Sequence, residues 1–184
     1  MKNYKKNFEI LKKNHVYSEE MEHDACGVGL IASTEGKKSR KVVEYGIEAL
    51  KAVWHRGAVD ADGKTGDGAG IHVEIPKDFF IEKIEVTGHS YNNSEICVGM
   101  IFLPRNDYAA QESCKTIVES ELTKNNFSIY GWRQVPVNPK VLGEKAFQTM
   151  PEIIQVLFKS NNPELLNKDL ERKIYETRRI IENK

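Results

Sequence analysis

The stretch HDACGVGLIAS, residues 23–33, sets a cysteine between an alanine and two closely spaced glycines. It opens the run CGVGLIA, residues 26–32, whose apolar character predicts a buried strand. Cys26 fits the interior of such a strand, because cysteine is small and often buried. The same position also suits a cysteine that becomes the first residue of the chain after cleavage behind Ala25. The rest of the sequence bears on the choice between these two interpretations.

The composition predicts one globular domain. The chain has 184 residues, of which 40% are hydrophobic and 29% are charged, a length that suits a single hydrophobic core. The 27 basic residues balance the 27 acidic residues, so charge gives no reason to expect binding to nucleic acid or to an anionic membrane surface. We therefore expect neither nucleic acid nor a membrane among its partners, and no apolar run approaches a membrane-spanning length.

Residues 1–25 differ from the rest of the chain and are interpreted as a leader or propeptide. They are polar and rich in Lys, Asn and Glu, with no apolar core of a secretory signal. Four acidic residues argue against a transit peptide, namely Glu9, Glu19, Glu20 and Glu22. We therefore expect a cytoplasmic protein with reduced cysteines. The odd count of cysteines (Cys26, Cys97 and Cys114) predicts neither a disulfide framework nor a zinc ribbon.

Apolar periodicity predicts a mixed α+β domain. Strands are expected over residues 26–32, 71–76, 96–104, 127–137 and 153–158. Helices are expected over residues 40–55 and 107–125, and from Pro163 to the C-terminus, with Gly57 as the left-handed residue that ends the first. Strands outnumber helices, and two of the helices are long enough to cover a sheet, so we expect an α+β or layered α/β/β/α domain.

Cys26 is the first candidate for chemistry. A thiol attacks as the thiolate and normally needs a base to remove its proton. Among the five histidines only His55, at the HRG turn, is a plausible partner, and nothing in the sequence marks it as a base. Cleavage behind Ala25 would instead free an α-amine with a reference pKa of about 7.7–8.0, which suits a general base. From the residues alone, a structural buried cysteine remains the commoner case.

The second candidate is the segment 54–71, WHRGAVDADGKTGDGAGI. Arg56 could bind a carboxylate or simply satisfy the last carbonyls of its helix. The TGDGAG run lacks the Lys-Ser/Thr of a phosphate loop, and a tight turn is the better interpretation. The three aspartates of the loop (Asp60, Asp62 and Asp67) lack the EF-hand pattern, so no metal site is expected. Cys97 and Cys114 are expected in the core.

These segments together resemble a known family. CGVGLIAS, the long run GIEALKAVWHRGAVDADGKTGDGAGIHVEIP, and the later GWRQVPVN and PEIIQVLF are similar to the glutaminase domain of the glutamate synthase large subunit. That domain is a class II glutamine amidotransferase of the N-terminal-nucleophile hydrolase family. The resemblance covers residues 26–184 and implies an αββα four-layer sandwich, present here only in part.

The resemblance also implies roles for individual residues. Cys26 matches the nucleophile that begins the mature domain, Ala25 precedes the propeptide cleavage site, and Arg56 matches an arginine of the L-glutamine pocket. The family releases ammonia, which passes to a second region that carries FMN and an iron–sulfur cluster and aminates 2-oxoglutarate. No cofactor or metal is expected in residues 1–184 themselves. The partner expected for this chain is the remainder of glutamate synthase, as downstream domains or as a separate chain.

Some motifs of the family do not occur in residues 1–184. These are an RFSTNTFP-like segment that grips the substrate carboxylate, an HNGE-like oxyanion hole and a later aspartate. An oxyanion donor alone is typically worth about 10²–10³ in rate, so we expect the isolated chain to be nearly inactive. The alternatives are an inactive remnant that serves binding or assembly or nothing, and a stand-alone cysteine hydrolase that uses His55.

Overall fold

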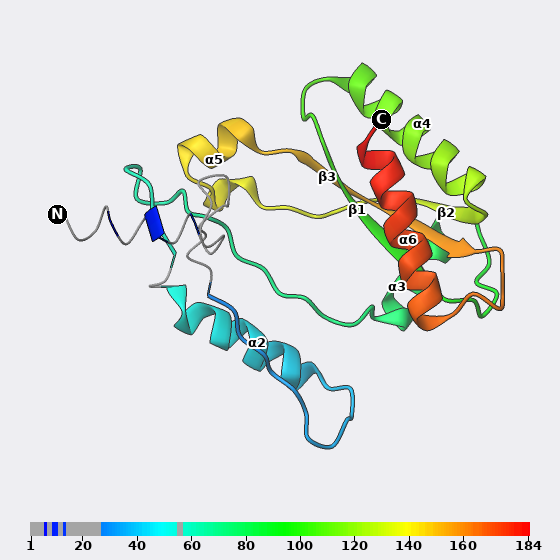
Figure 1. Cartoon of the computed structure of the whole chain (residues 1–184), viewed down its shortest axis with the longest axis horizontal. Coiled ribbons are helices and arrows are strands. Elements are labelled where there is room, and N and C mark those ends of the chain that lie inside the picture. The colour runs from blue at the N-terminus through cyan, green and yellow to red at the C-terminus, as the bar shows by residue number, and fades with distance from the viewer. Residues whose placement is uncertain (1–5, 7–8, 11–12, 14–26, 55–56) are drawn as a thin grey trace. The chain divides into compact units, whose positions relative to one another are not determined.

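The structure is a computed structural model that describes residues 6, 9–10, 13, 27–54 and 57–184. The chain divides into two compact units. The smaller unit comprises Met1–Val59 and Gly66–Ile71, and the larger comprises Asp60–Thr65 and His72–Lys184. The larger unit contains a sheet with helices on both faces, and the smaller unit contains one long helix (Figure 1).

The sheet of the larger unit has three strands in the order β1-β3-β2. The strands are β1 (Cys97–Leu103), β2 (Phe127–Gln134) and β3 (Glu152–Ser160). Both pairings are antiparallel, with Cys97 opposite Phe158 and Phe127 opposite Ser160. Strands β1 and β2 therefore run parallel with β3 between them, and helix α4 (Tyr108–Lys124) connects them. This is a split β-α-β arrangement, and it confirms the predicted strands near residues 96–104, 127–137 and 153–158.

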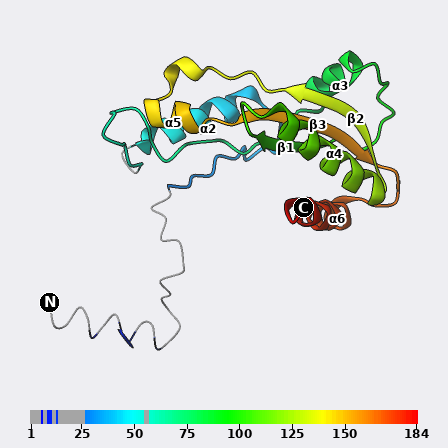
Figure 2. The ribbon, with the colours of Figure 1, turned by 90° about the horizontal axis from the view of Figure 1, so that it is seen from above.

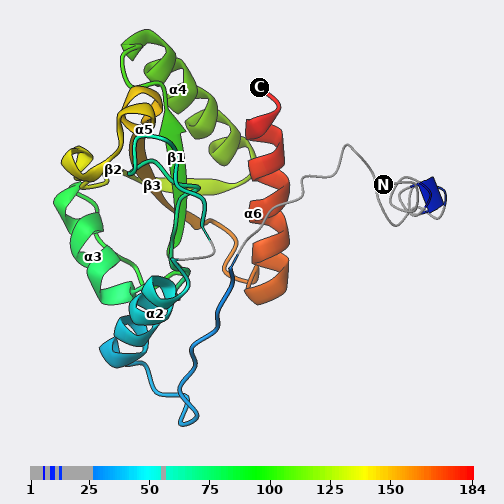
Figure 3. The ribbon, with the colours of Figure 1, turned by 90° about the vertical axis from the view of Figure 1, so that its left-hand side faces the viewer.

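Helices cover the two faces of this sheet unequally. Helices α4 and α6 (Asn167–Glu182) lie on one face, and α3 (Lys77–Val86) lies on the other (Figures 2 and 3). The core beneath α4 and α6 consists of Cys97, Val118, Leu122, Phe127, Val156, Phe158 and Leu170. The core beneath α3 consists of Phe80, Ile84, Ile96, Tyr130 and Leu157. Alternate residues of β3 thus enter opposite cores, as the two-residue period of a strand requires.

The helix ends follow local side-chain chemistry. The side chain of Asp107 accepts the N–H of Ala110 at 2.9 Å and so begins α4 as an N-cap, which confirms the helix predicted over residues 107–125. The predicted start of the last helix at Pro163 is wrong. Asn162 instead accepts the N–H of Glu164 in a turn, and Leu166 is extended, so α6 begins at Asn167.

The smaller unit contains helix α2 (Arg40–Ala52), which confirms most of the helix predicted over residues 40–55. Its N-cap Ser39 accepts the N–H of Lys41 at 3.2 Å. The helix ends at Ala52, with Val53 as its C-cap, so Gly57 lies beyond its end and does not terminate it. Trp54, which lies within the range predicted as helix, also follows the helix and is 73% exposed.

Two predicted strands are not strands. Residues 27–32 and 71–76 form neither strand nor helix, although their sequences are apolar or alternating. Val28 and Leu30 are 93% and 88% exposed. A strand exists only when a neighbour completes its hydrogen bonds, and residues 27–32 and 71–76 have no such neighbour in the described part of the chain.

The described residues of the larger unit form three layers, with one sheet between two layers of helices, where the resemblance led us to expect two sheets between helices. Sequence patterns also missed three short elements, namely α3, the 3₁₀ turn η2 (Pro139–Val141) and α5 (Glu144–Thr149). Helix α3 buries Phe80 and Ile84, four residues apart, which is a pattern too short to indicate a helix without its packing partner. Among the described helices, none has the length and apolar character needed to cross a bilayer.

Leu157 provides a test of this architecture. It is fully buried at the centre of β3, so Leu157→Ala should lower the free energy of unfolding by about 2–5 kcal/mol, measured by urea denaturation. Phe102→Ala, at a side chain that is 63% exposed on β1, is the matched control and should cost much less. Equal losses in the two variants would contradict the central position of β3.

Candidate active site

The predicted site residues lie outside the residues that the structure describes. Cys26, Ala25, Arg56 and the alternative base His55 all belong to this group, as does nearly all of the leader 1–25. Their roles therefore remain predictions. The described segments that follow Cys26 and Arg56 show the surroundings to which these residues are joined.

The segment after Cys26 is open. Residues 27–32 make no ladder hydrogen bonds, and a Cβ added at Gly29 would meet no atom within 4 Å. The Val28 and Leu30 side chains in this segment are exposed.

The segment after Arg56 is held by a short antiparallel contact in the smaller unit. Gly57 donates its N–H to the carbonyl of Trp54 at 3.0 Å, and Ala58 donates its N–H to Oδ2 of Asp67 at 2.9 Å. Val59 and Gly66 form a β-bridge. These bonds fix the chain within three residues of Arg56, as a binding residue on a loop requires.

The tip of the same loop, residues 60–65, is a tight turn in the larger unit. The tight turn had been expected further along the loop, at the TGDGAG run of residues 65–70. Asp60 donates its N–H to the carbonyl of Thr65 at 2.8 Å, and Gly63 has a φ of 68°, which glycine adopts without strain. Oδ1 of Asp62 accepts the N–H groups of Lys64 and Thr65, and its Oδ2 accepts the Thr65 hydroxyl at 2.5 Å. The Thr65 hydroxyl, followed by these backbone donors, holds the pKa of Asp62 well below its usual range.

Helix α5 fixes this tip from a distant part of the sequence. Lys145 Nζ lies 2.6 Å from Oδ2 of Asp60, and the N–H of Ala146 donates to the Thr65 hydroxyl at 3.5 Å. A Cβ at Gly143 would collide with Thr65 and Asp62, so only glycine allows this approach. These contacts could not be predicted from the sequence, because more than 75 residues separate the partners and no local pattern links them.

The aspartates of this loop therefore stabilise the loop itself or bind it to α5. Each of Asp60, Asp62 and Asp67 accepts a hydrogen bond or ion pair from a different protein group. The described residues contain no cluster of three His, Cys, Asp or Glu side chains that could hold a metal ion. Iron–sulfur clusters need several cysteine thiolates, and the described cysteines, Cys97 and Cys114, do not provide such a set.

The described cysteines differ in exposure. Cys97 is buried in the core beneath α4 and α6, as predicted, while Cys114 on α4 is half-buried. Burial raises the pKa of the Cys97 thiol to about 12. Because the thiolate is the attacking species, Cys97 does not act as a nucleophile near neutral pH.

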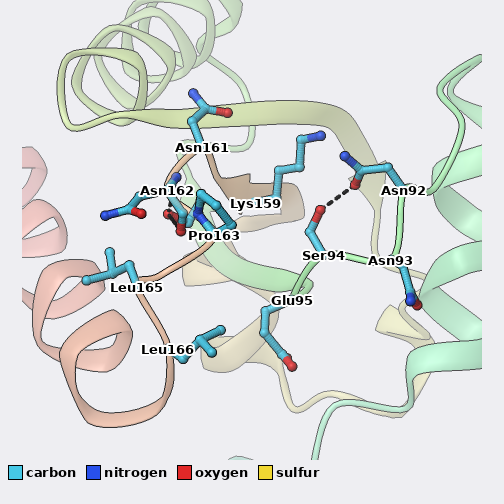
Figure 4. Close-up of a pocket in the computed structure, with 11 residues that line it drawn as sticks. Asn92, Asn93, Ser94, Glu95, Lys159, Asn161, Asn162, Pro163, Leu165 and Leu166 are labelled. Atoms are coloured by element: carbon cyan, nitrogen blue, oxygen red, sulfur yellow. Dashed lines mark hydrogen bonds between the residues drawn. The ribbon is translucent and has the colours of Figure 1, made fainter.

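A polar cavity of about 480 Å³ lies in the larger unit, where the turn before β1 meets the connection from β3 to α6 (Figure 4). Its lining includes Asn92, Ser94, Lys159, Asn161 and Leu165. The Ser94 hydroxyl bonds to the side chain of Asn92, and Lys159 Nζ lies 5.4 Å from the ring centre of Tyr130. The described cysteines do not line this cavity, so it provides no thiol nucleophile.

Comparison with known proteins identifies the family. The family described as glutamine amidotransferases, class II, matches residues 26–184. The chain belongs to this family.

Its relatives include much longer proteins. The chain is 52% identical over 179 residues to the large chain of NADPH glutamate synthase from Azospirillum brasilense, which is 97% of this chain but 12% of that protein. It is 38% identical over 178 residues to ferredoxin-dependent glutamate synthase 2 of Arabidopsis thaliana, and 37% identical over 165 residues to ferredoxin-dependent glutamate synthase 2 of Synechocystis. The match covers 95% and 89% of this chain and 11% and 10% of those proteins.

The turn at Asp62 predicts how the stability of this amidotransferase chain depends on pH under acidic conditions. Because the folded-state pKa of Asp62 is lowered, its carboxylate stabilises the fold above the ordinary aspartate pKa of about 3.9, and this contribution is lost as pH falls through the folded value. Thr65→Val removes the largest cause of the lowering and should move the Asp62 titration upward. Carboxyl NMR measures the midpoint.

Thr149→Val is the matched control, because the Thr149 hydroxyl bonds to the carbonyl of Lys145 and makes no contact with Asp62. It should leave the Asp62 titration unchanged. An identical Asp62 midpoint in the wild type and Thr65→Val would show that the Thr65 hydroxyl does not hold this carboxylate.

Proposed function

We propose that this chain is the N-terminal part of the glutaminase domain of a glutamate synthase, with residues 1–25 as a propeptide and residues 26–184 as amidotransferase domain. The domain hydrolyses L-glutamine to glutamate and ammonia, and the ammonia aminates 2-oxoglutarate elsewhere in the enzyme. The observation that carries the proposal is the family match, which begins at Cys26. The glutamate synthases of Azospirillum and Arabidopsis support the assignment.

In the proposed reaction, Cys26 supplies both the nucleophile and the base. Removal of the leader frees its α-amine, which takes the thiol proton at neutral pH. The thiolate attacks the side-chain amide carbon of glutamine, the C–N bond breaks, and the nitrogen leaves as ammonia with the transferred proton. Water then cleaves the γ-glutamyl thioester, which releases glutamate and restores the thiol.

Arg56 is proposed to bind glutamine. A guanidinium donates two parallel hydrogen bonds to a carboxylate or carbonyl group, and the bonds of Gly57 and Ala58 hold the chain directly after Arg56. Arg56 is a substrate-binding residue in this proposal and takes no part in proton transfer.

The remainder of the enzyme supplies what residues 1–184 lack. The oxyanion hole and the second substrate clamp belong to that remainder, so the isolated chain is proposed to be nearly inactive. FMN and the iron–sulfur cluster are proposed to belong to that remainder as well.

Labelling with a glutamine-like diazoketone tests the nucleophile. In the full-length protein, we expect a mature N-terminus at Cys26 and one label per chain on Cys26, both read by mass spectrometry. Cys97 should remain unlabelled because its thiol is protonated at neutral pH.

Two variants control this experiment. Cys26→Ala should abolish both labelling and glutaminase activity, whereas Cys114→Ala should preserve both. A full-length protein that retains Met1 and takes no label would favour the alternative of an inactive remnant over the proposed enzyme.

Arg56→Gln tests the binding role. Loss of a charge-assisted hydrogen bond costs about 1.5–3 kcal/mol, so kcat/KM for glutamine in the full-length enzyme should fall roughly 10–150-fold. Arg40→Gln is the control, because Arg40 is an exposed residue that pairs with Glu44 on α2. Similar values of kcat/KM for Arg56→Gln and the wild type would show that Arg56 does not bind glutamine.

A further inference from the structure

Within the described residues of the larger unit, the outer edge of β1 shows none of the features that usually protect an edge strand. Its sequence, CVGMIFL, contains no charged residue and no proline. In the larger unit, the described residues pair β1 with β3 alone. Met100 and Phe102 are 49% and 63% exposed. Stable domains normally block such an edge with charge, proline, a bulge or a covering element.

The other edge of the sheet is different. Strand β2 contains a bulge between Ile129 and Gly131, and a Cβ at Gly131 would collide with Thr87, the residue that ends α3. Arg133 places a charged group on the same strand and donates to Gln155 at 2.7 Å. Bulges and charges of this kind discourage pairing with a further strand. Of the two edges of the sheet, the β1 edge is therefore the one that can accept another strand.

The topology indicates on which side of the sheet a strand that followed α6 would lie. Helices α4 and α6 lie on one face of the sheet (Figure 3), but α4 follows β1 and α6 follows β3, which runs in the opposite direction. The crossover from β1 through α4 passes β3 to reach β2. A crossover of the same hand from β3 through α6 must move the other way, past β1. Such crossovers share one hand in about 98% of cases.

We propose that the outer edge of β1 accepts one further strand, antiparallel to β1, from the polypeptide that follows α6 in the longer glutamate synthase. The added strand completes a β-α-β-β-α-β unit and covers Met100 and Phe102. The inference rests on the proposed function only in taking the chain as part of that longer enzyme. It assigns the sheet edge a partner within the same protein, in preference to a second copy of the chain.

The test compares the chain alone with two extended forms. One carries, after Lys184, the roughly 20 residues that follow the matched segment in the Azospirillum protein, since a tethered strand is present at high effective concentration. The other carries the same residues in scrambled order. Amide hydrogen exchange is measured by NMR for each residue of β1 and β2.

We expect every second amide of β1 to exchange at least tenfold more slowly with the native extension than with the scrambled one. Alternate amides of an edge strand point away from the sheet and gain partners only when a strand is added. The amides of β2 should exchange at the same rate in all three forms. Phe102→Lys should reverse most of the protection in the extended chain, whereas Tyr108→Lys, at an exposed residue on α4, should not.

Two results would overturn the proposal. One is equal exchange of β1 with the native and the scrambled extensions. The other is protection of β1 in the chain alone that grows with protein concentration, which would assign the edge to a second copy. Neither readout depends on glutaminase activity, so failure of this proposal and failure of the proposed function are distinguishable.

Discussion

The central strand β3 holds the larger unit together, because it is the strand of this sheet that pairs with both of the others. It pairs with β1 on one side and β2 on the other, so both neighbours depend on it for their ladder hydrogen bonds. Its alternate side chains enter both cores, with Val156 and Phe158 beneath α4 and α6, and Leu157 beneath α3. Gly99 of β1 shows how close this packing is, since a Cβ there would lie 2.8 Å from a methyl group of Val156.

Elements with strong local signals could be predicted from sequence. The three paired strands are rich in β-branched and aromatic residues, and α4 has a clear N-cap in Asp107, so their positions were correct. Residues 27–32 and 71–76 carry similar apolar signals but are not strands. Their apolar residues favour burial. A strand also needs a neighbouring strand to pair with, and sequence patterns do not specify that neighbour.

The candidate site shows the same division between local and distant information. Glycine and aspartate favour turns locally, which led us to expect a tight turn at residues 65–70, whereas the structure has the turn at residues 60–65. The contacts of this turn with α5, through Lys145 and Gly143, could not be predicted, because no local sequence pattern links two segments that lie so far apart in the chain. The roles of Cys26 and Arg56 came from long motifs of a family, and the family match confirms the family while leaving those roles to experiment.

The loop after Arg56 has a consequence for how the chain can be divided. Its base, at Val59 and Gly66, belongs to the smaller unit, and its tip, at Asp60–Thr65, belongs to the larger. The backbone therefore passes between the units three times, at residues 59–60, 65–66 and 71–72. A gene cut at any single codon cannot separate the two units intact.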